Sequence, residues 1–280
     1  MTKRFCIFIL AMPLLFLSCD EIFETQKTES ADENTELDKN EDSSSEESSS
    51  GGAELPSQNS TTGSESSGKT ESQKTGTVTF YTTYDNDSVA YYTPELESGW
   101  YKCAVSENKL NEFPPQSAVK ITYNDKTIRV LVTDLCPNAG NSHWTSKSDY
   151  FFDLAENAFA ALEDTEKGLI DVSIQRIAYE TKQNIKFAVK EGSNQYWLAG
   201  RFYNMRYPLA KVEYSSNGSS FKEMKKLSGN ENNWWVIESG NDLMSNMTFR
   251  LTDVYDNTIT GEKISKLSVD GKYDIGKNFP

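Results

Sequence analysis

Two carboxylates at the ends of predicted elements are the residues best suited to chemistry on a substrate. Asp134 follows the strand-like run 130–133, and Asp153 follows the aromatic pair 151–152, just ahead of a predicted short helix. Functional side chains are commonly placed at element ends and on loops held by a rigid scaffold. We therefore expect Asp134 and Asp153 to face one cleft, with Thr79 from an earlier strand as a third polar member.

This pair of carboxylates suits acid–base work on a glycan. Aromatic rings ahead of Asp153 would raise its pKa by desolvating it, and a protonated carboxyl is what a glycosidase general acid needs. Hydrolysis needs a second group as base or nucleophile, for which Asp134 is the nearby candidate. The structural alternatives are that Asp134 bonds a turn and that Asp153 caps a helix. On the residues alone, these structural roles are favoured.

Other chemistries lack the residues that they need. His143 is the single histidine, which argues against a metal site of the usual kind. A Ser-His-Asp triad built on His143 has no nucleophile motif to support it. The chain has no Gly-rich phosphate loop and no basic stripe, so we expect no cofactor, no metal and no nucleic-acid partner.

The first 19 residues are predicted to be an export signal. A positively charged start precedes an apolar run over residues 5–17, which is typical of a signal peptide and too short for a comfortable membrane span. Residues 15–19 resemble a bacterial lipobox. That resemblance implies cleavage before Cys19 and lipidation of its thiol, and a plain signal peptide is the alternative.

Residues 20–75 are predicted to be a disordered tether. They hold 15 acidic and 4 basic residues, and so carry most of the chain's formal charge of −14. A Ser- and Glu-rich segment with almost no aromatics cannot bury enough apolar surface to offset the entropy of ordering. Self-repulsion should keep it extended, as a stalk between an anchor and a folded part.

The remaining residues are predicted to form two β-rich domains. Residues 76–183 have about six short strands and two short helices, a pattern that suits a compact β-barrel. The helix expected over 153–168 has an apolar stripe at Leu154, Ala158, Phe159 and Leu162. Residues 184–280 have seven strand-like segments between turn signals, which indicates a β-sandwich. These segments are 185–189, 196–203, 210–214, 221–227, 234–238, 247–252 and 263–267.

Cys103 and Cys136 are the two cysteines of the predicted folded part. In an exported protein, a lone pair of cysteines predicts one disulfide. The alternative is two buried thiols.

Two aromatic pairs in the second domain predict a binding surface. Adjacent residues of a strand point to opposite faces, so Tyr196-Trp197 and Trp234-Trp235 should each supply one core ring and one exposed ring. Exposed rings in a row suit flat sugar faces and usually mark a binding surface. The alternative is that all four rings are core.

Taken together, these segments resemble a bacterial expansin over essentially all of residues 76–280. The resemblance rests on several short motifs in the right order, each of them weak alone. They are VTFY (78–81), VTDLCP (132–137), FDLAENAF (152–159), VKEGS (189–193), YW (196–197), RYP (206–208) and LTD (251–253).

The resemblance implies an all-β protein with a six-stranded double-psi β-barrel and an immunoglobulin-like, cellulose-binding β-sandwich. It implies loosening of cell walls without detectable hydrolysis, and hence a protein that is not an enzyme. Carried over by motif, the barrel cleft holds Thr79, Asp134 and Asp153. The sandwich platform holds Lys190, Tyr196 and Trp197.

Three departures from the expansin pattern bear on these sites. Cys136 stands where many bacterial expansins have a tyrosine, which removes a cleft ring and supports the bridge to Cys103. Tyr196 stands where a tryptophan is common and offers less stacking area. The third platform ring has no match, and Trp234 is the expected substitute, with Trp235 turned into the core. If Tyr196 and Trp197 both face outward, the strand must bulge or twist there.

The expected function is non-hydrolytic loosening of a wall polymer: cellulose, xyloglucan or peptidoglycan. One alternative is a lytic transglycosylase or endoglucanase that uses Asp153 and Asp134, and another is an adhesin that only binds walls. We expect a monomer that contacts membrane only through its N-terminal lipid. It should be exported to the cell surface or outer membrane, or else secreted.

Overall fold

The computed structural model describes residues 71–82, 89–92 and 94–280, without the side chains of residues 142 and 143. The signal peptide predicted over 1–19, the lipidated Cys19 and nearly all of the tether predicted over 20–75 lie outside the described residues. In the described part, no helix is both long and apolar enough to cross a membrane.

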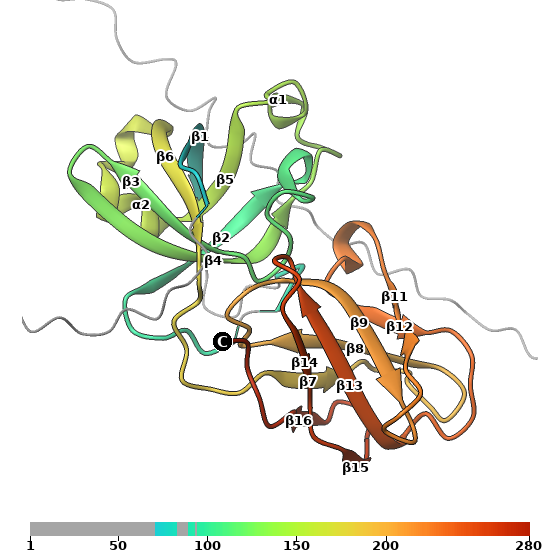
Figure 1. Ribbon diagram of the computed structural model, residues 1–280. Helices are drawn as coiled ribbons and strands as arrows, with labels where there is room; N and C mark the ends of the chain where they lie inside the picture. The colour runs from blue at the N-terminus through green and yellow to red at the C-terminus, as the bar shows by residue number, and fades with distance from the viewer. Residues whose placement is uncertain (1–70, 83–88, 93) are drawn as a thin grey trace, which may run out of the picture. The chain divides into compact units, whose positions relative to one another are not determined.

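The N-terminal half of the described chain is a closed six-stranded barrel with the strand order β1-β5-β2-β4-β3-β6 (Figure 1). Its strands are β1 (Lys74–Tyr81), β2 (Trp100–Ser106), β3 (Ala118–Tyr123), β4 (Lys126–Cys136), β5 (Tyr150–Ala155) and β6 (Ile170–Ile177). Strand β1 runs parallel to β5, and β2 runs parallel to β4, while the other neighbours are antiparallel. The predicted barrel is therefore confirmed.

Local sequence explains much of the barrel. Strand β6 alternates buried and more exposed residues along its length, which is the period of a half-buried strand. The predicted hairpin forms from β3 and β4, with Asn124 at a positive φ of 53° in its turn. Asparagine tolerates this left-handed conformation better than most residues.

Short helices lie on the barrel connections: α1 (Ser142–Thr145), α2 (Glu156–Leu162) and the 3₁₀ turns η2 (Glu107–Lys109) and η3 (Thr165–Lys167). Helix α2 buries Ala158, Phe159 and Leu162, as its apolar stripe predicted. It begins three residues later than expected, and Ala155 occupies the position before its first residue. The suggested capping role of Asp153 is therefore wrong, because Asp153 lies inside β5.

The C-terminal half consists of two β-sheets, consistent with the predicted sandwich (Figure 1). One sheet has the order β10-β9-β13-β14, with β15 also paired to β13, and the other has the order β11-β12-β8-β7-β16. The strands are β7 (Lys186–Val189), β8 (Leu198–Tyr203), β9 (Leu209–Ser215), β10 (Lys222–Glu223), β11 (Lys225–Lys226), β12 (Trp235–Ile237), β13 (Ser245–Asp253), β14 (Thr258–Thr260), β15 (Ile264–Lys266) and β16 (Lys272–Asp274), with the 3₁₀ turn η4 (Gly229–Glu231).

Two details of the sandwich differ from the predicted strands. The segment expected over 221–227 splits at buried Met224 into β10 and β11, which belong to different sheets. Strand β8 begins at Leu198, so Tyr196 and Trp197 precede it. Their side chains therefore do not have to point to opposite faces, as neighbouring residues of a regular strand do.

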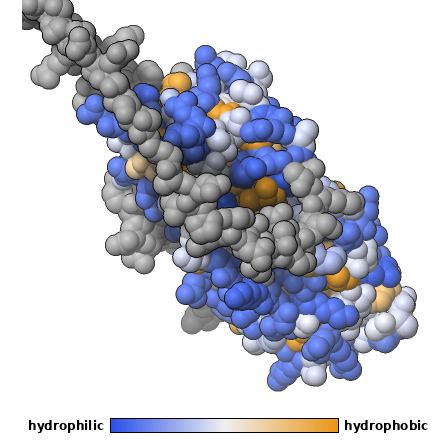
Figure 2. Space-filling view, turned by 60° about the vertical axis from the view of Figure 1, so that its left-hand side comes forward, coloured by the Kyte–Doolittle hydropathy of each residue, from blue (hydrophilic) through white to orange (hydrophobic). Residues whose placement is uncertain are grey.

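Each half has its own apolar core. The barrel core includes Val78, Phe113, Val132, Phe152 and Phe159. The sandwich core includes three rings in mutual contact, Phe187, Phe202 and Phe249, whose centroids lie 4.4 to 5.3 Å apart in tilted or edge-on arrangements. On the face shown in Figure 2, hydrophilic residues dominate the coloured surface. Among the described residues, the exposed large hydrophobic side chains are Tyr196 and Val269.

Candidate functional site

The centre of the barrel site is a hydroxyl–carboxylate pair. Thr79 on β1 and Asp153 on β5 are register partners, and the Thr79 Oγ1 hydroxyl donates a 2.5 Å hydrogen bond to Asp153 Oδ1. Asp153 is only 3% exposed, whereas Thr79 is half-buried. A buried carboxylate needs such partners, since burial without them is costly. The structure thus brings together two of the three predicted cleft residues.

Asp134 lies on β4, two residues before the strand ends, and is half-buried. Its Oδ1 atom accepts hydrogen bonds from the backbone N–H groups of Ala90, at 2.7 Å, and Leu135, at 2.8 Å. These bonds are charge-assisted and fix the orientation of the carboxylate. They also tie the segment around Ala90 to the barrel, which is a structural role of the kind considered above.

Strand β2 separates the two carboxylates. Ala104 pairs with Asp153 on one side and with Asp134 on the other. Two inter-strand spacings place the Asp134 and Asp153 backbones about 10 Å apart. The Ala104 side chain between them is buried and packs in a cluster with Cys136, Trp144 and Tyr150.

The predicted disulfide between Cys103 and Cys136 is absent, and this prediction is wrong. Both residues lie on neighbouring parallel strands, but Cys103 pairs with Val132 and Cys136 pairs with Ser106. A three-residue offset at about 3.3 Å per residue puts the Cα atoms roughly 10 Å apart or more, beyond the reach of a disulfide.

Both cysteines are buried instead. The Cys103 Sγ contacts the Leu131 carbonyl oxygen at 3.5 Å, and Cys136 packs against Trp144 and Tyr150. Burial, together with the negative charges of Asp134 and Asp153, holds the pKa of the Cys103 thiol well above its usual value.

Sequence reasoning missed two aromatic neighbours of the site. Tyr91 is fully buried, and burial followed by the charges of Asp134 and Glu107 raises its pKa. Its hydroxyl has no hydrogen-bond partner among the described residues. Trp144 packs edge-on against Tyr150, with ring centroids 5.2 Å apart. Trp144 lies in the connection that follows Asp134, which was a local signal, whereas Tyr91 precedes β2, far from both carboxylates in the sequence, and gave none.

The sandwich brings Lys190 and Trp234 together. The Lys190 Nζ lies 4.8 Å from the centroid of the Trp234 ring, and it also pairs with Glu231 at 3.5 Å. The Arg201 guanidinium carbon lies 4.5 Å from the same ring. Trp234 is half-buried, and its partly exposed ring already has two cations beside it.

The other predicted platform residues lie in the turn between β7 and β8. Tyr196 is 59% exposed, and Trp197 is half-buried. Trp235, by contrast, is 4% exposed and packs in the sandwich core. One residue of the Trp234-Trp235 pair therefore faces inward, whereas both residues of the Tyr196-Trp197 pair retain exposed surface.

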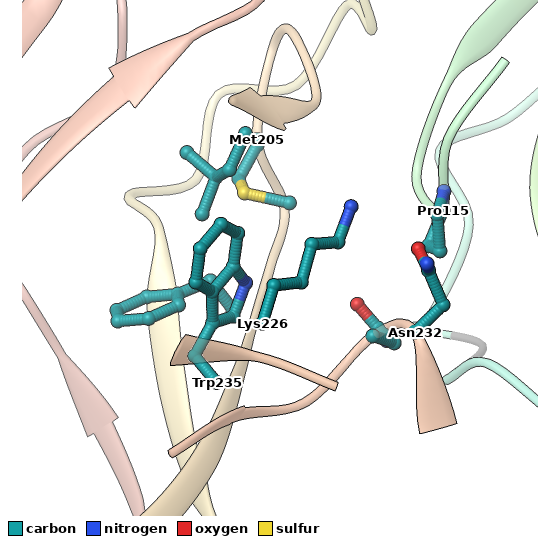
Figure 3. Close-up of a pocket in the computed structure, with 8 residues that line it drawn as sticks. Pro115, Met205, Lys226, Asn232 and Trp235 are labelled. Atoms are coloured by element: carbon teal, nitrogen blue, oxygen red, sulfur yellow. The ribbon is translucent and has the colours of Figure 1, made fainter. Parts of the chain in front are cut away.

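A small cavity lined mainly by sandwich residues is not a glycan site. Its volume of about 10 Å³ gives room for about one water molecule (Figure 3). Lys226 lies beside Trp235 in this cavity, and burial lowers the pKa of the Lys226 ammonium. The lining residues are Pro115, Phe202, Met205, Leu209, Lys226, Asn232, Asn233 and Trp235. Within the described residues, no group of three or more His, Cys, Asp or Glu side chains is placed to hold a metal ion.

Comparison with known proteins supports the same fold. Residues 89–174, most of the barrel, match the family model described as lytic transglycolase. Expansin-like protein 5 of Dictyostelium discoideum is 29% identical over 149 residues, which are 51% of this chain and 61% of the relative. Expansin-like protein 1 of the same organism is 27% identical over 115 residues, or 41% of this chain and 38% of the relative. The chain thus spans less than two thirds of the length of these two relatives.

A bacterial relative and a solved structure extend over both halves. Expansin-YoaJ of Bacillus subtilis is 26% identical over 187 residues, which are 67% of this chain and 70% of the relative. The crystal structure of an apo expansin from Clavibacter michiganensis gives a TM-score of 0.61 at 20% identity, and covers 74% of this chain and 98% of that chain. A mutant of that expansin, solved in complex with cellohexaose, gives the same values. The chain therefore has an expansin-type double-psi barrel and shares the fold of a solved expansin.

Proposed function

We propose that this protein loosens polysaccharide cell walls without cutting their chains, and that it binds cellulose or a related wall glycan. The observation that carries the proposal is the hydrogen-bonded Thr79–Asp153 pair of the barrel, which Ala104 on β2 separates from Asp134. Similarity to expansins supports it, as does the cellohexaose complex of a protein with the same fold.

In this proposal the sandwich adsorbs to the polymer through Tyr196 and Trp197, with Lys190 and Trp234 as further platform residues. Aromatic rings offer apolar area that suits the flat faces of sugar rings. The barrel then grips a neighbouring chain, and the Asp153 carboxylate accepts hydrogen bonds from its hydroxyl groups. Competition for the hydrogen bonds between polymer chains lets those chains slip, with no covalent bond broken.

The carboxylate geometry favours gripping over hydrolysis. Retaining and inverting glycosidases hold their two carboxyl groups about 5 to 9.5 Å apart, with the second one available as a nucleophile or base. Here Asp134 already accepts two backbone N–H groups on one oxygen. An Asp134 so engaged is a poor base or nucleophile.

The second candidate is a glycan-cleaving enzyme, either a lytic transglycosylase or an endoglucanase, that uses Asp153 and Asp134. The lytic transglycolase description of the matching family model favours it. In that case Asp153 is the general acid, and soluble sugar is released from peptidoglycan or cellulose.

The setting is part of the proposal. Export by residues 1–19, lipidation at Cys19 and an extended tether over 20–75 would present the barrel (76–183) and the sandwich (184–280) to the wall from the cell surface or outer membrane. A secreted form without the lipid is the alternative. The protein would act as a monomer.

The decisive experiment is a paired assay on the purified protein. Creep of a cellulose network under constant load is recorded while reducing sugars are assayed in the same sample, and the assay is repeated with peptidoglycan. Creep without sugar release, lost in Asp153→Asn, is the expected result. Sugar release that disappears in Asp153→Asn would establish the enzyme instead. Adsorption without creep and without sugar release would indicate an adhesin that only binds walls.

A further inference from the structure

The turn between β7 and β8 presents two neighbouring aromatic residues at the surface, which a regular strand does not do. The Lys190 N–H donates to the Ala199 carbonyl at 2.9 Å, and the Asn194 N–H donates to the Trp197 carbonyl at 2.8 Å. These bonds close the turn over residues 190–199. The backbone within the turn must then satisfy its remaining polar groups locally.

The Asn194 side chain supplies an acceptor for the backbone of both aromatic residues in this turn. The Asn194 Oδ1 atom accepts from the N–H of Tyr196 at 2.9 Å and from the N–H of Trp197 at 3.2 Å. An asparagine side chain that bonds the backbone two and three residues ahead mimics a backbone turn. It therefore fixes the backbone orientation of the two residues that carry the rings.

The carbonyl groups of the same turn are held from the other side. The Gly240 N–H donates to the Tyr196 carbonyl at 3.0 Å, and the Leu243 N–H donates to the Gln195 carbonyl at 3.1 Å. Leu243 is buried in the sandwich core, so this second contact is anchored. The Tyr196 backbone is thus bound through both its N–H and its C=O, while its ring is 59% exposed.

We propose that Asn194 is the positioning residue of the aromatic platform, because its carboxamide oxygen holds the backbone of Tyr196 and Trp197 in the orientation that displays both rings. This inference rests on the proposed glycan binding. Asn194 is itself exposed, and its side chain hydrogen-bonds to the backbone of residues 192, 196 and 197 within the same turn, so its role is local. A preordered pair of rings binds a rigid polymer face more tightly, because less conformational freedom is lost on binding.

The test compares two substitutions at one position. Asn194→Ala removes the acceptor, whereas Asn194→Asp keeps an acceptor oxygen in the same place. Adsorption isotherms of the purified protein on microcrystalline cellulose should show binding weakened about threefold to tenfold by Asn194→Ala and close to wild type for Asn194→Asp. Trp197→Ala is the positive control for loss of the platform.

Amide hydrogen exchange supplies a readout that does not depend on binding. Exchange of the Tyr196 and Trp197 amides should accelerate in Asn194→Ala and stay slow in Asn194→Asp, while amides of β7 and β8 remain unchanged. Wild-type adsorption by Asn194→Ala would overturn the inference. So would equal weakening by both substitutions, or accelerated exchange across the whole sandwich in Asn194→Ala.

The failure of the inference can be told apart from failure of the proposed function. If the wild-type protein does not adsorb to any wall glycan, or if Trp197→Ala leaves adsorption unchanged, the platform itself is refuted. The positioning of the two rings by Asn194 is still decided in that case by the exchange rates of their amides.

Discussion

The Thr79 hydroxyl and the Asp153 carboxylate face each other on paired rungs of parallel strands β1 and β5, 2.5 Å apart. The two residues are 74 positions apart in the chain, so only the closed barrel brings them together. The hydrogen bond engages one oxygen of the carboxylate and orients the other. It therefore links barrel stability to the geometry of the proposed gripping residue.

Replacing Thr79 by valine should destabilise the barrel while preserving side-chain shape. Loss of a hydrogen bond to a buried charged group costs about 1.5–3 kcal/mol of unfolding free energy. Denaturant unfolding of the purified protein measures this change. Thr79→Ser keeps the hydroxyl and is the matched control, expected to cost clearly less. Equal losses for valine and serine would show that the methyl group, not the hydrogen bond, matters at this position.

Replacing Asp153 by asparagine should abolish loosening but leave adsorption intact. The amide keeps the size of the carboxylate but loses the negative charge that makes strong, charge-assisted hydrogen bonds with sugar hydroxyls. We expect the creep rate of a cellulose network to fall about tenfold or more. A tenfold fall corresponds to about 1.4 kcal/mol of activation free energy. Unchanged creep in a folded Asp153→Asn protein would contradict a gripping role for this residue.

Local pattern was enough to predict the main elements of the barrel. Apolar residues recur about every 2 residues along a half-buried strand and about every 3.6 residues along a helix. The β3–β4 hairpin and the buried stripe of α2 follow from these two periods. Asp153 was harder, because an aspartate just before a helical stripe has the sequence signature of a cap. The parallel pairing of β5 with β1 extends the strand through Asp153, and no local pattern reports that pairing.

Non-local register also explains the wrong disulfide. Cysteine counting and export predicted a Cys103–Cys136 bond, but only the β2–β4 register sets their offset. The platform rings show the same limit. Tyr196 and Trp197 were expected at the start of a strand, whereas the hydrogen bonds of Asn194 form a turn there. Trp235 turned inward as expected, but all three residues of β12 are buried, so alternation within this strand is not the reason.

The buried thiols should make the protein insensitive to reductant. Because no disulfide joins Cys103 to Cys136, the melting temperature should be the same with and without dithiothreitol. The native protein should also resist alkylation at Cys103, since the raised pKa and the burial keep this thiol protonated and covered. Mass spectrometry after iodoacetamide treatment, native against denatured, measures this directly. A drop in melting temperature on reduction would contradict the prediction.

The same thiol should make stability depend on alkaline pH. An unfolded cysteine thiol has a pKa of about 8.5, and the folded-state pKa of Cys103 lies above it. The folded state therefore retains a proton that the unfolded state loses. The stabilisation is fully present below that pH and declines as pH rises toward the folded pKa, by about 1.4 kcal/mol per unit. Denaturant unfolding between pH 7 and about 9.5 measures how the unfolding free energy changes with pH. This pH range lies below the pKa of ordinary tyrosines.

Cys103→Ala is the control for this slope. Removing the thiol should flatten the dependence of unfolding free energy on pH in that window, even though the smaller side chain lowers stability overall. An unchanged slope would assign the effect to another group.

The adjacent tryptophans Trp234 and Trp235 should separate binding from stability. Trp235 is 4% exposed in the sandwich core, so Trp235→Ala should cost about 3–5 kcal/mol. Trp234 is half-buried with Lys190 and Arg201 beside its ring, and Trp234→Ala should cost only about 1 kcal/mol. If Trp234 belongs to the platform, its replacement should weaken adsorption to cellulose in a protein that remains folded. Denaturant unfolding and adsorption isotherms on the two variants test both halves. Loss of adsorption only in step with loss of stability would remove Trp234 from the platform and leave Tyr196 and Trp197 as its rings.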